Sequence, residues 1–366
     1  MDTARDWIAL SMAQGLGPSG FWRLVESVGS PAAVLDRKYN DLLRVSGLRK
    51  GQLEDLRQTA RLREAAAIEL EKLQELGGVP VIFEDPDYPG LLRKCINPPP
   101  LLYVKGNKSL LNNGAVAIVG SRAATGYGRR IAFNLGRDLA GNHITVVSGL
   151  ATGIDTEAHC GCLAGSGTTI AVLGCGLDVV YPRSNKSLYS RIEEQGALVT
   201  EYCLGTKPEG FRFPARNRII AGLCHGVVVV EAAKKSGSLI TVGHALEEGR
   251  EVFAVPGQVD SSKSSGTHWL LQQGASLAVC AADIIAGLGL TGNDAPVAPD
   301  RANANIELDT ETAALFRMID HYPKQRNELV ERSGMNPGKI SEHLLLLELD
   351  GLIEILPGDL IRRITA

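Results

Sequence analysis

The chain has 366 residues, a formal net charge of −3 at pH 7, and 44% hydrophobic and 22% charged residues. This length predicts two or three domains, and the composition is that of an ordinary globular protein. No apolar run approaches the roughly 18 residues that cross a bilayer, and the first residues lack the basic start and apolar core of a signal peptide. We therefore expect neither a membrane span nor export.

The seven cysteines are scattered along the chain. An odd number without a signal peptide indicates reduced thiols, so a cytoplasmic protein is expected. Only Cys160 and Cys162 lie close together, and a C-x-C pair alone is a poor metal signature. We therefore interpret the cysteines as small hydrophobic residues, and we expect neither a metal nor a cofactor.

Residues 1–78 are predicted to form a small helical domain. Apolar residues at helical spacing follow the turns Leu16-Gly17-Pro18 and Ser46-Gly47-Leu48, and an amphipathic helix is expected over 63–76. The turns are similar to those of helix–hairpin–helix or SAM-like units, and a helical bundle that only packs on its neighbour fits the same pattern. A strand over 79–83 and a proline-rich, irregular connector are expected next.

Residues 79–286 are predicted to form the core, an α/β domain with an extended Rossmann-like, mostly parallel sheet. Apolar strand candidates alternate with helical patterns, as in a doubly wound sheet with both faces covered. The strand candidates are 115–119, 143–148, 168–173, 197–201, 226–231, 251–255 and 276–279. The helix candidates are 127–140, 154–164, 185–195, 215–223, 239–248 and 267–273. Ligands of such sheets bind outside the carboxyl ends of the strands, so the loops there are expected to form the site.

The loop after the first of these strands is the most informative stretch of the chain. The strand ends at Gly120, Ser121 and Arg122 follow at once, and a helix is expected from about Tyr127. Free N–H groups and the positive end of the helix dipole face such a loop, and a guanidinium group pairs with phosphate through two hydrogen bonds. The loop therefore suits a phosphodiester. It is neither a G-x-G-x-x-G dinucleotide fingerprint nor a P-loop, because the required glycines and the Gly-Lys-Ser/Thr end are absent.

Small residues also follow the second strand of this domain. Ser148 and Gly149 let the backbone approach a ligand, and the helix that begins at Ile154 directs its N-terminus at the same loop. We interpret Asp155 as a capping or dipole-pairing residue rather than a catalyst. His159 is interpreted as a hydrogen-bonding residue rather than a base.

The loop 203–214 and the helix after it combine basic and aromatic side chains. Pro214 is predicted to open the helix, which places two arginines in its first turn, where the helix dipole disfavours cations. That placement makes sense if an anion lies in front of them, and ion pairing with a nearby glutamate is the alternative. Basic residues among aromatics are also typical of single-strand binders. The candidate binding residues are Lys207, Phe213, Arg216, Asn217 and Arg218.

A second candidate anion site follows the strand that ends at Glu231. Ser236, Gly237 and Ser238 come directly before the next helix, and two lysines precede them. Glu231 fits either a general base or the partner of a nearby lysine or arginine. The spacing of the residues indicates no catalytic triad and no metal cluster.

The C-terminal part is predicted to contain a linker over 287–306, rich in Gly, Pro, Asn and Ala, and a winged-helix-like domain over 307–366. The outline of that domain is a helix ending at Ser333, a second helix over 337–349 and a hairpin.

The distribution of charge separates the core from this tail. Lys and Arg number 16 against 14 Asp and Glu in residues 107–290, but 8 against 13 in residues 291–366. On the helix that would read DNA, Lys339 and His343 are offset by Glu342 and Glu348. A nucleic-acid site is therefore expected as a local patch of the core. The tail is interpreted as a protein-interaction or packing module, and a winged domain that contacts DNA is the alternative.

Several of these segments resemble one family, the DNA-processing protein A (DprA, or Smf) family of natural transformation. The resemblance covers roughly residues 80 to 285. The matching stretches are YPGLLRKCINPPPLLYVKG at 88–106, VAIVGSRAATGYG at 116–128, SGLATGIDTEAH at 148–159, TIAVLGCGLDVVYPRSN at 169–185, FPARNRIIAGL at 213–223, VVVVEAAKKSGSLITVGHALEEGREVFAVPG at 227–257 and GTHWLLQQGA at 266–275.

The resemblance implies a protein that binds single-stranded DNA through its core, forms a homodimer and loads the RecA recombinase onto incoming strands, without catalytic turnover. The family's Gly-Ser-Arg loop is similar to Gly120, Ser121 and Arg122, which are then expected in a basic pocket for phosphates and bases.

Two other hypotheses fit parts of the sequence. Nucleotide phosphoribohydrolases of the lysine-decarboxylase-like type share the fold class, but their G-G-x-G-T-x-x-E loop has only a partial equivalent at Ser236-Gly237-Ser238-Leu239, without the glutamate. Glu201 and Glu231 remain candidates for that chemistry. A winged-helix transcription regulator with a ligand-sensing core is the third hypothesis, and the acidic tail weighs against it.

Overall fold

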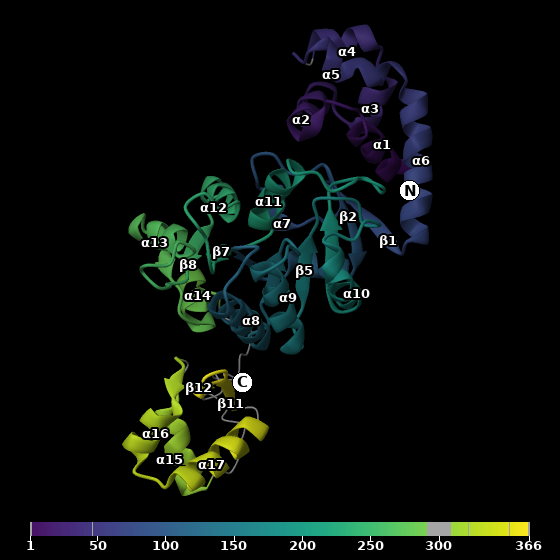
Figure 1. The fold of residues 1–366 in the computed structure, drawn as a ribbon. Helices are drawn as coiled ribbons and strands as arrows, with labels where there is room; N and C mark the ends of the chain where they lie inside the picture. The colour runs from purple at the N-terminus through teal and green to yellow at the C-terminus, as the bar shows by residue number, and fades with distance from the viewer. Residues whose placement is uncertain (1, 46, 291–308, 321, 351, 365–366) are drawn as a thin grey trace. The chain divides into compact units, whose positions relative to one another are not determined.

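A computed structural model describes residues 2–45, 47–290, 309–320, 322–350 and 352–364 (Figure 1). The chain divides into two compact units, Met1–Ala295 and Pro296–Ala366. Most of the predicted linker, from residue 291 onward, lies outside the described residues, and its first two residues belong to helix α14 (Ala281–Leu288).

The N-terminal part of the first unit is helical. Its helices are α1 (Asp2–Ser11), α2 (Gly17–Val28), α3 (Pro31–Asp36), α4 (Tyr39–Val45), α5 (Lys50–Leu53), a 3₁₀ turn (Glu54–Arg57) and α6 (Thr59–Glu75). Gly17 has a φ of 56° and Gly47 a φ of 61°, a left-handed backbone that favours glycine and explains why both turns carry it. The helix predicted over 63–76 is α6, which begins four residues earlier.

The helical part and the sheet share one hydrophobic core. The Trp22 ring lies 4.6 Å from the Phe83 ring, centroid to centroid, and its Nε1 donates to the carbonyl oxygen of Pro98 at 2.7 Å. Ser19 on the same helix contacts Asn97, with 3.1 Å between Oγ and Oδ1. Helix α2 is therefore fixed to the loop that precedes the second strand of the sheet.

The sheet of the first unit has nine strands in the order β1-β2-β6-β5-β4-β3-β7-β8-β9. The strands are β1 (Gly78–Ile82), β2 (Leu101–Gly106), β3 (Ala115–Val119), β4 (Thr145–Ser148), β5 (Thr169–Val172), β6 (Ala197–Thr200), β7 (Gly226–Val229), β8 (Glu251–Ala254) and β9 (Ser276–Leu277). Strands β3 to β9 are parallel, and β2 runs antiparallel between β1 and β6. The predicted α/β class is thereby confirmed, although β2 was not predicted.

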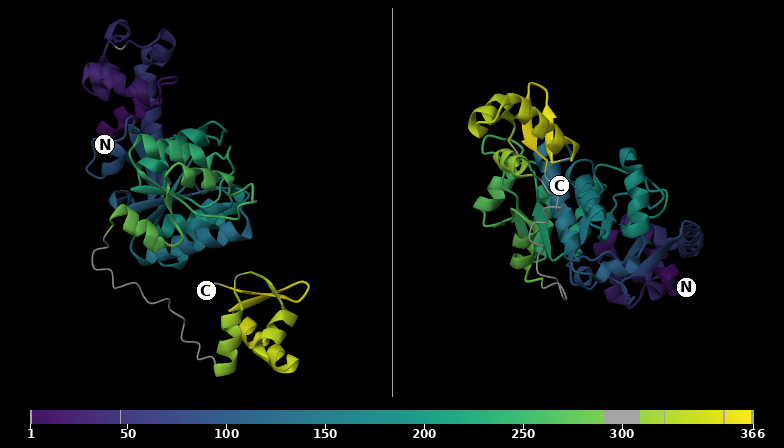
Figure 2. Two further views of the ribbon diagram at one scale, coloured as in Figure 1. Left: turned by 90° about the vertical axis from the view of Figure 1, so that its left-hand side faces the viewer. Right: turned by 90° about the horizontal axis from the view of Figure 1, so that it is seen from below.

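Helices cover both faces of this sheet (Figure 2). Val116 and Ile118 of β3 pack in the cluster that contains residues of α8 (Gly126–Gly141), α9 (Ile154–Ala164) and α14. Ala117 and Val119 face the cluster of α11 (Arg212–Gly222), α12 (Ser238–Glu247) and α13 (Ser265–Gln272). Helix α10 (Lys186–Gln195) packs on β2 and β6. Because alternate residues of a strand point to opposite faces, a continuous apolar run is what such a layered fold needs.

The strand order reverses between β3 and β7. The chain moves outward from β3 through β6 and then returns to place β7 on the other side of β3. In doubly wound sheets the loops diverge at such a switch point and leave a crevice outside the carboxyl ends of the strands. The loops after β3 and β7 are therefore the edge where a ligand site is expected.

The second unit contains the winged-helix domain. Its elements are α15 (Thr310–Met318), β10 (Lys324–Gln325), α16 (Arg326–Ser333), α17 (Pro337–Leu349), β11 (Ile353–Leu356) and β12 (Leu360–Arg363), with strand order β10-β12-β11. Its core is formed by Leu315, Leu329, Ile340, Leu344 and Ile361. The two predicted helices and the hairpin are confirmed, and α15 and β10 are additions.

No helix in the part of the chain that the structure describes has both the length and the apolar character needed to cross a membrane.

Candidate nucleic-acid interface

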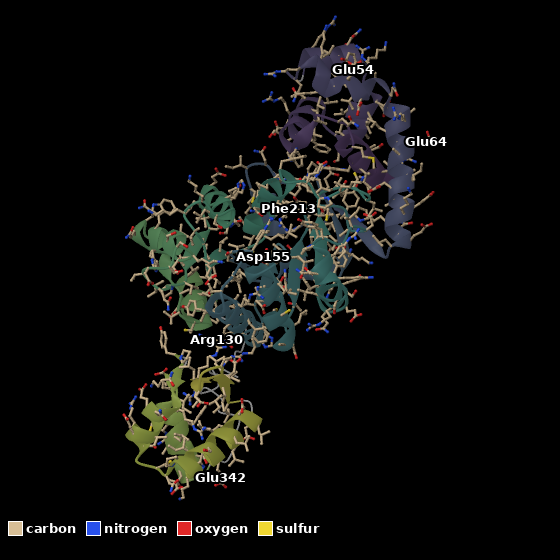
Figure 3. The ribbon with its side chains drawn as sticks, in the orientation of Figure 1. Glu54, Glu64, Arg130, Asp155, Phe213 and Glu342 are labelled. Atoms are coloured by element: carbon tan, nitrogen blue, oxygen red, sulfur yellow. The ribbon has the colours of Figure 1, made fainter. Side chains whose placement is uncertain are left out.

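Two adjoining cavities lie at the carboxyl edge of the sheet. The larger has a volume of about 350 Å³ and the smaller about 90 Å³. Both are lined by Arg122, Ala151, Tyr181, Phe213 and Arg216. The larger also contacts Gly120, Asp155, Asn217, Gly237, Ser238 and Thr241, and the smaller contacts residues 149–152 and 173–175. Phe213 and Asp155 mark this region of the first unit in Figure 3.

The Gly120 loop is held in place by backbone contacts to its neighbours. Ser121 N donates to the carbonyl oxygen of Glu231 at 2.8 Å, and Ile154 N donates to the carbonyl oxygen of Ser121 at 3.2 Å. A Cβ at Gly120 would lie 2.7 Å from the Ile154 side chain, so only glycine fits there. These contacts tie the loop to β7 and α9, and the exposed Arg122 follows Ser121 and lines both cavities.

Glu231 has a structural role that neither sequence interpretation predicted. Its carboxylate accepts hydrogen bonds from Thr125 N at 3.0 Å and from the Thr125 hydroxyl. Thr125 in turn caps α8, because its hydroxyl accepts from Gly128 N at 3.1 Å. Glu231 is buried and enters no ion pair among the described residues, so it fixes the loop that holds Arg122.

Three side chains that line both cavities form a stack. The rings of Tyr181 and Phe213 lie 5.3 Å apart with 30° between their planes, and the Arg122 guanidinium lies 5.2 Å from the centre of the Phe213 ring. Tyr181 is 41% exposed. Aromatic faces next to a guanidinium group are the surfaces on which nucleic-acid bases stack. Tyr181 was not among the predicted site residues, and its only signal was an aromatic residue in a loop after a strand.

Arg216 is a buried arginine with one hydrogen-bond donor that has no partner. It is only 3% exposed, its Nη1 donates to the carbonyl oxygen of Gly149 at 2.9 Å, and its Nε has no hydrogen-bond partner. Burial lowers the pKa of Arg216 to about 10, and the nearby Asp155 carboxylate opposes that shift. Because a buried donor without a partner is costly, an anion or a base carbonyl in the cavity would stabilise it.

Asp155 braces the loop beneath this arginine. Its Oδ2 accepts from Gly149 N at 3.1 Å and from Ala151 N at 3.3 Å. Burial raises the pKa of Asp155, while Arg216 and the two N–H groups lower it. Asp155 lies in the first turn of α9, the position of the predicted dipole pairing, but it does not cap the helix, because the N–H groups from which it accepts precede α9.

His159 also lies behind the cavities. It is fully buried and its Nδ1 lies 2.7 Å from the hydroxyl of Thr169. Burial lowers its pKa to about 3, so the imidazole is neutral near pH 7.

The helix predicted over 215–223 is α11, and its predicted start was wrong by three residues. The helix begins at Arg212, because proline is tolerated within a first turn and Pro214 therefore does not have to open the helix. Arg216 and Arg218 lie in the second turn, so the dipole argument does not apply to them. Residues two apart lie on nearly opposite sides of a helix, and the two arginines have different surroundings.

Arg218 points away from the cavities. It forms an ion pair with Glu201, and its Nη1 donates to the carbonyl oxygen of Asn97 at 2.9 Å. Burial raises the pKa of Glu201, and Arg218 opposes that shift. The ion-pair alternative therefore holds for Arg218 and not for Arg216.

The remaining predicted residues fall into two groups. Gly237 and Ser238, at the start of α12, line the larger cavity together with Gly120 and Arg122, so the structure brings the two predicted anion-binding loops together. The N-cap of α12 has no side-chain hydrogen bond. Ser148 is buried and donates to the Ile118 carbonyl oxygen at 2.6 Å. Ser121, Ser148, Lys207, Arg218 and Ser236 do not line either cavity.

The described residues contain no group of His, Cys, Asp and Glu placed to hold a metal ion, and all seven cysteines are free thiols. The two carboxylates considered for hydrolysis, Glu201 and Glu231, are bound to Arg218 and Thr125 and line neither cavity.

Comparison with known proteins gives one consistent result. Residues 80–289 match the family described as DNA recombination-mediator protein A, and residues 298–359 match the DprA winged helix domain. Protein Smf of Synechocystis is 33% identical over 386 aligned residues, which cover 96% of each chain. DNA processing protein DprA of Streptococcus pneumoniae is 48% identical over 202 residues, 55% of this chain and 71% of that protein.

Two solved structures are similar in fold as well as sequence. The X-ray structure of DprA from Streptococcus pneumoniae has a TM-score of 0.68 and 39% identity, and the match covers 77% of this chain and 97% of that one. The Helicobacter pylori DNA processing protein A, described for its single-stranded DNA binding mode, has a TM-score of 0.52 and 31% identity over 58% and 95% of the two chains.

Proposed function

This chain belongs to the DNA recombination-mediator protein A family, which includes the DprA and Smf proteins, and we propose that it binds single-stranded DNA and loads the RecA recombinase onto it in natural transformation and recombination. The observation that supports this function most directly is the Arg122–Phe213–Tyr181 stack above a buried arginine with an open donor. The Helicobacter pylori relative, which is described for its single-stranded DNA binding mode, also supports this proposal.

The two cavities suit different parts of a nucleotide. The smaller one lies against Leu150, Leu173 and the Phe213 ring, which suits a base. The larger one has Arg122, Arg216 and the N-terminus of α12 in its wall, which suits a phosphate. Every base has a face that can stack, so this site binds single strands with little sequence preference. Paired bases cannot reach it, and duplex DNA therefore binds less well.

We also propose a homodimer that forms through the open edge of the sheet at β9. This strand pairs on one side only, with β8. Leu277 in the strand and Val279 just after it are more than half exposed. Leu246 and Trp269, from the neighbouring helices α12 and α13, are exposed as well. An uncovered edge with apolar side chains favours pairing with another chain, and a second copy would cover it.

We propose that the protein catalyses no reaction. We also propose that it acts in the cytoplasm, where recombinase and incoming strands meet. Both carboxylates that a phosphoribohydrolase would need are engaged in structural contacts. The bound strand would be held unpaired on the stack, which is the state that a recombinase needs.

Titration of the full chain with labelled oligonucleotides tests DNA binding. We expect tight binding of single strands that weakens with salt, and weaker binding of duplex and mononucleotide. RecA loading is tested by strand exchange on single strands already covered by a single-strand binding protein, where addition of the chain should speed exchange. Equal affinity for duplex, or release of a free base from a mononucleotide, would contradict the proposal.

A further inference from the structure

Helix α17 exposes three leucines that the core of its domain does not use. Leu345, Leu346 and Leu349 are 55%, 45% and 75% exposed, and together they form what we term the leucine face. The buried side of the same helix is complete without them, since Ile340, His343, Leu344 and Leu347 already pack inward. In a winged-helix domain this is the helix that would enter the major groove of DNA.

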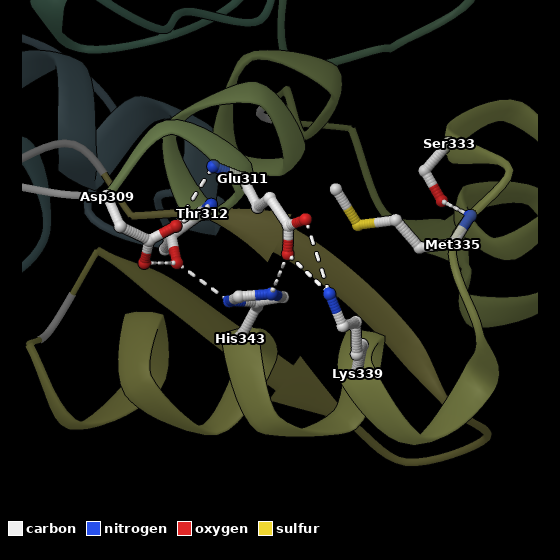
Figure 4. A network of polar contacts seen from close by, with 7 residues as sticks. All are labelled: Asp309, Glu311, Thr312, Ser333, Met335, Lys339 and His343. Atoms are coloured by element: carbon white, nitrogen blue, oxygen red, sulfur yellow. Dashed lines mark hydrogen bonds and ion pairs between the residues drawn. The ribbon is translucent and has the colours of Figure 1, made fainter.

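The basic side chains of α17 are bound within the domain (Figure 4). Lys339 Nζ lies 3.0 Å from Glu311 Oε2, and His343 Nδ1 lies 2.7 Å from the Thr312 hydroxyl. His343 Nε2 faces the same Glu311 carboxylate at 3.5 Å. The sequence predicted that Glu342 and Glu348 offset these charges, but the partner is Glu311 on α15. Neither side chain is therefore free to meet a phosphate.

Carboxylates surround the leucine face. Glu342, Glu348 and Asp350 are exposed, and none of them enters an ion pair in the described part of the chain. One turn of helix separates Glu342 from Leu346, so the acidic groups border the apolar surface on the same side of α17. The surface has an apolar centre with an acidic rim, and this pattern repels a DNA backbone.

We propose that the leucine face binds an amphipathic helix of a partner protein, one whose apolar stripe is flanked by lysine or arginine. Leucines at the centre supply the buried area, and the carboxylates at the rim pair with the basic flanks and fix the orientation. A second copy of this chain fits less well. A twofold contact would bring the same acidic rims against each other. This surface is independent of the DNA-binding proposal, because it shares no residue with the cavities.

The test uses the full chain and two synthetic helical peptides of about five turns, one of leucine and lysine and one with every lysine replaced by glutamate. We expect fluorescence anisotropy to show binding of the lysine peptide and not of the glutamate peptide. The double variant Leu345→Ser, Leu349→Ser should bind it about tenfold more weakly. Ile68→Ser, at a side chain 46% exposed on α6, is the matched control and should bind as the parent does.

Charge reversal distinguishes binding that depends on charge complementarity from nonspecific hydrophobic binding. The variant Glu342→Lys, Glu348→Lys should lose the lysine peptide and gain the glutamate peptide, with an unchanged circular dichroism spectrum. Equal binding of both peptides to the parent chain would overturn the proposal. It would also be overturned if the leucine variant lost duplex DNA binding, or if its sedimentation showed that a self-associated form had dissociated.

Discussion

The cavities beside Arg122 and the exposed face of α17 each combine a few basic residues with nonpolar side chains, yet they offer a ligand opposite chemistry. At the cavities, Arg122 is exposed and Arg216 retains an unpartnered Nε. On α17, Lys339 and His343 both contact Glu311. The first surface can accept an anion without breaking any contact, and the second must first give up an ion pair.

From this difference we expect the number of basic residues to be a poor guide to nucleic-acid binding. We expect binding to depend on whether their donors are already occupied and whether they lie next to a surface on which bases stack. The same rule separates Arg216 from Arg218, which lie two residues apart on one helix: the first has an open donor, and the second is bound to Glu201 and Asn97.

The largest expected effect is on stability, at Arg218. Arg218→Ala leaves the Glu201 carboxylate buried without a partner, which costs about 3 kcal/mol of unfolding free energy. Single-strand affinity should change little, because Arg218 lines neither cavity. Urea unfolding and oligonucleotide titration measure the two quantities. The double variant with Glu201→Gln should recover most of the stability, and a large loss of affinity in a folded Arg218→Ala protein would show that occupied donors can still bind DNA.

Removal of the stacking surface is expected to have the next largest effect. Phe213→Ala takes away the ring that contacts both Tyr181 and Arg122, and should weaken single-strand binding about tenfold to a hundredfold. Phe211→Ala is the matched control, since that ring is 67% exposed and lines neither cavity. If the two variants bind alike, the stack is not the binding surface.

A smaller effect is expected at Arg122. Arg122→Ala should weaken binding uniformly across sequences and lower the slope of log affinity against log salt by about one unit, as for one lost phosphate contact. Arg191→Ala, an exposed arginine on α10, serves as the control. An unchanged slope in a folded Arg122→Ala protein would remove this side chain from the phosphate site.

The smallest effect concerns the basic side chains of the winged domain that contact Glu311. Glu311→Gln releases Lys339 and His343, and duplex affinity of the full chain at low salt should rise about twofold to threefold and fall again at high salt. Glu331→Gln removes the same charge from an exposed position on α16 without freeing a cation. An equal rise with Glu331→Gln would mean that net charge, and not occupancy, governs this surface.

Much of the fold could be predicted because strands buried on both faces are continuous apolar runs. All seven parallel strands lie within the predicted ranges, which extended up to two residues too far at either end. Strand β2 was missed because it follows three prolines. Its place in the sheet depends on antiparallel pairing with β1, which precedes it, and with β6, which comes much later in the chain. The sequence contains no local signal for such a pairing.

The site was predictable where a local pattern determines it and not where packing does. Gly120 and Arg122 could be placed at this edge of the sheet because a strand, a loop and a helix follow in direct succession, whereas Ser121 of the same loop lines neither cavity. Tyr181 could not, since its contact with Phe213 joins the loop after β5 to the first turn of α11, and no local pattern of the sequence indicates that contact. Nor could the roles of Arg216 and Arg218 be separated, because that requires knowing that Glu201 lies beside one of them.

The return of the chain at the switch point has a consequence for how the protein is made. The Arg122 loop is complete early in synthesis, but the contacts that fix it come from Glu231, and the floor of the larger cavity comes from Ser238. Contacts between segments so distant in sequence form late and slowly, because the intervening chain must be ordered first. A growing chain that ends before β7 therefore has the residues of the stack but lacks both Glu231, which fixes the Arg122 loop, and Ser238, which lines the larger cavity. During refolding, affinity for single strands should return together with hydrogen-exchange protection of the β7 amides and not before it.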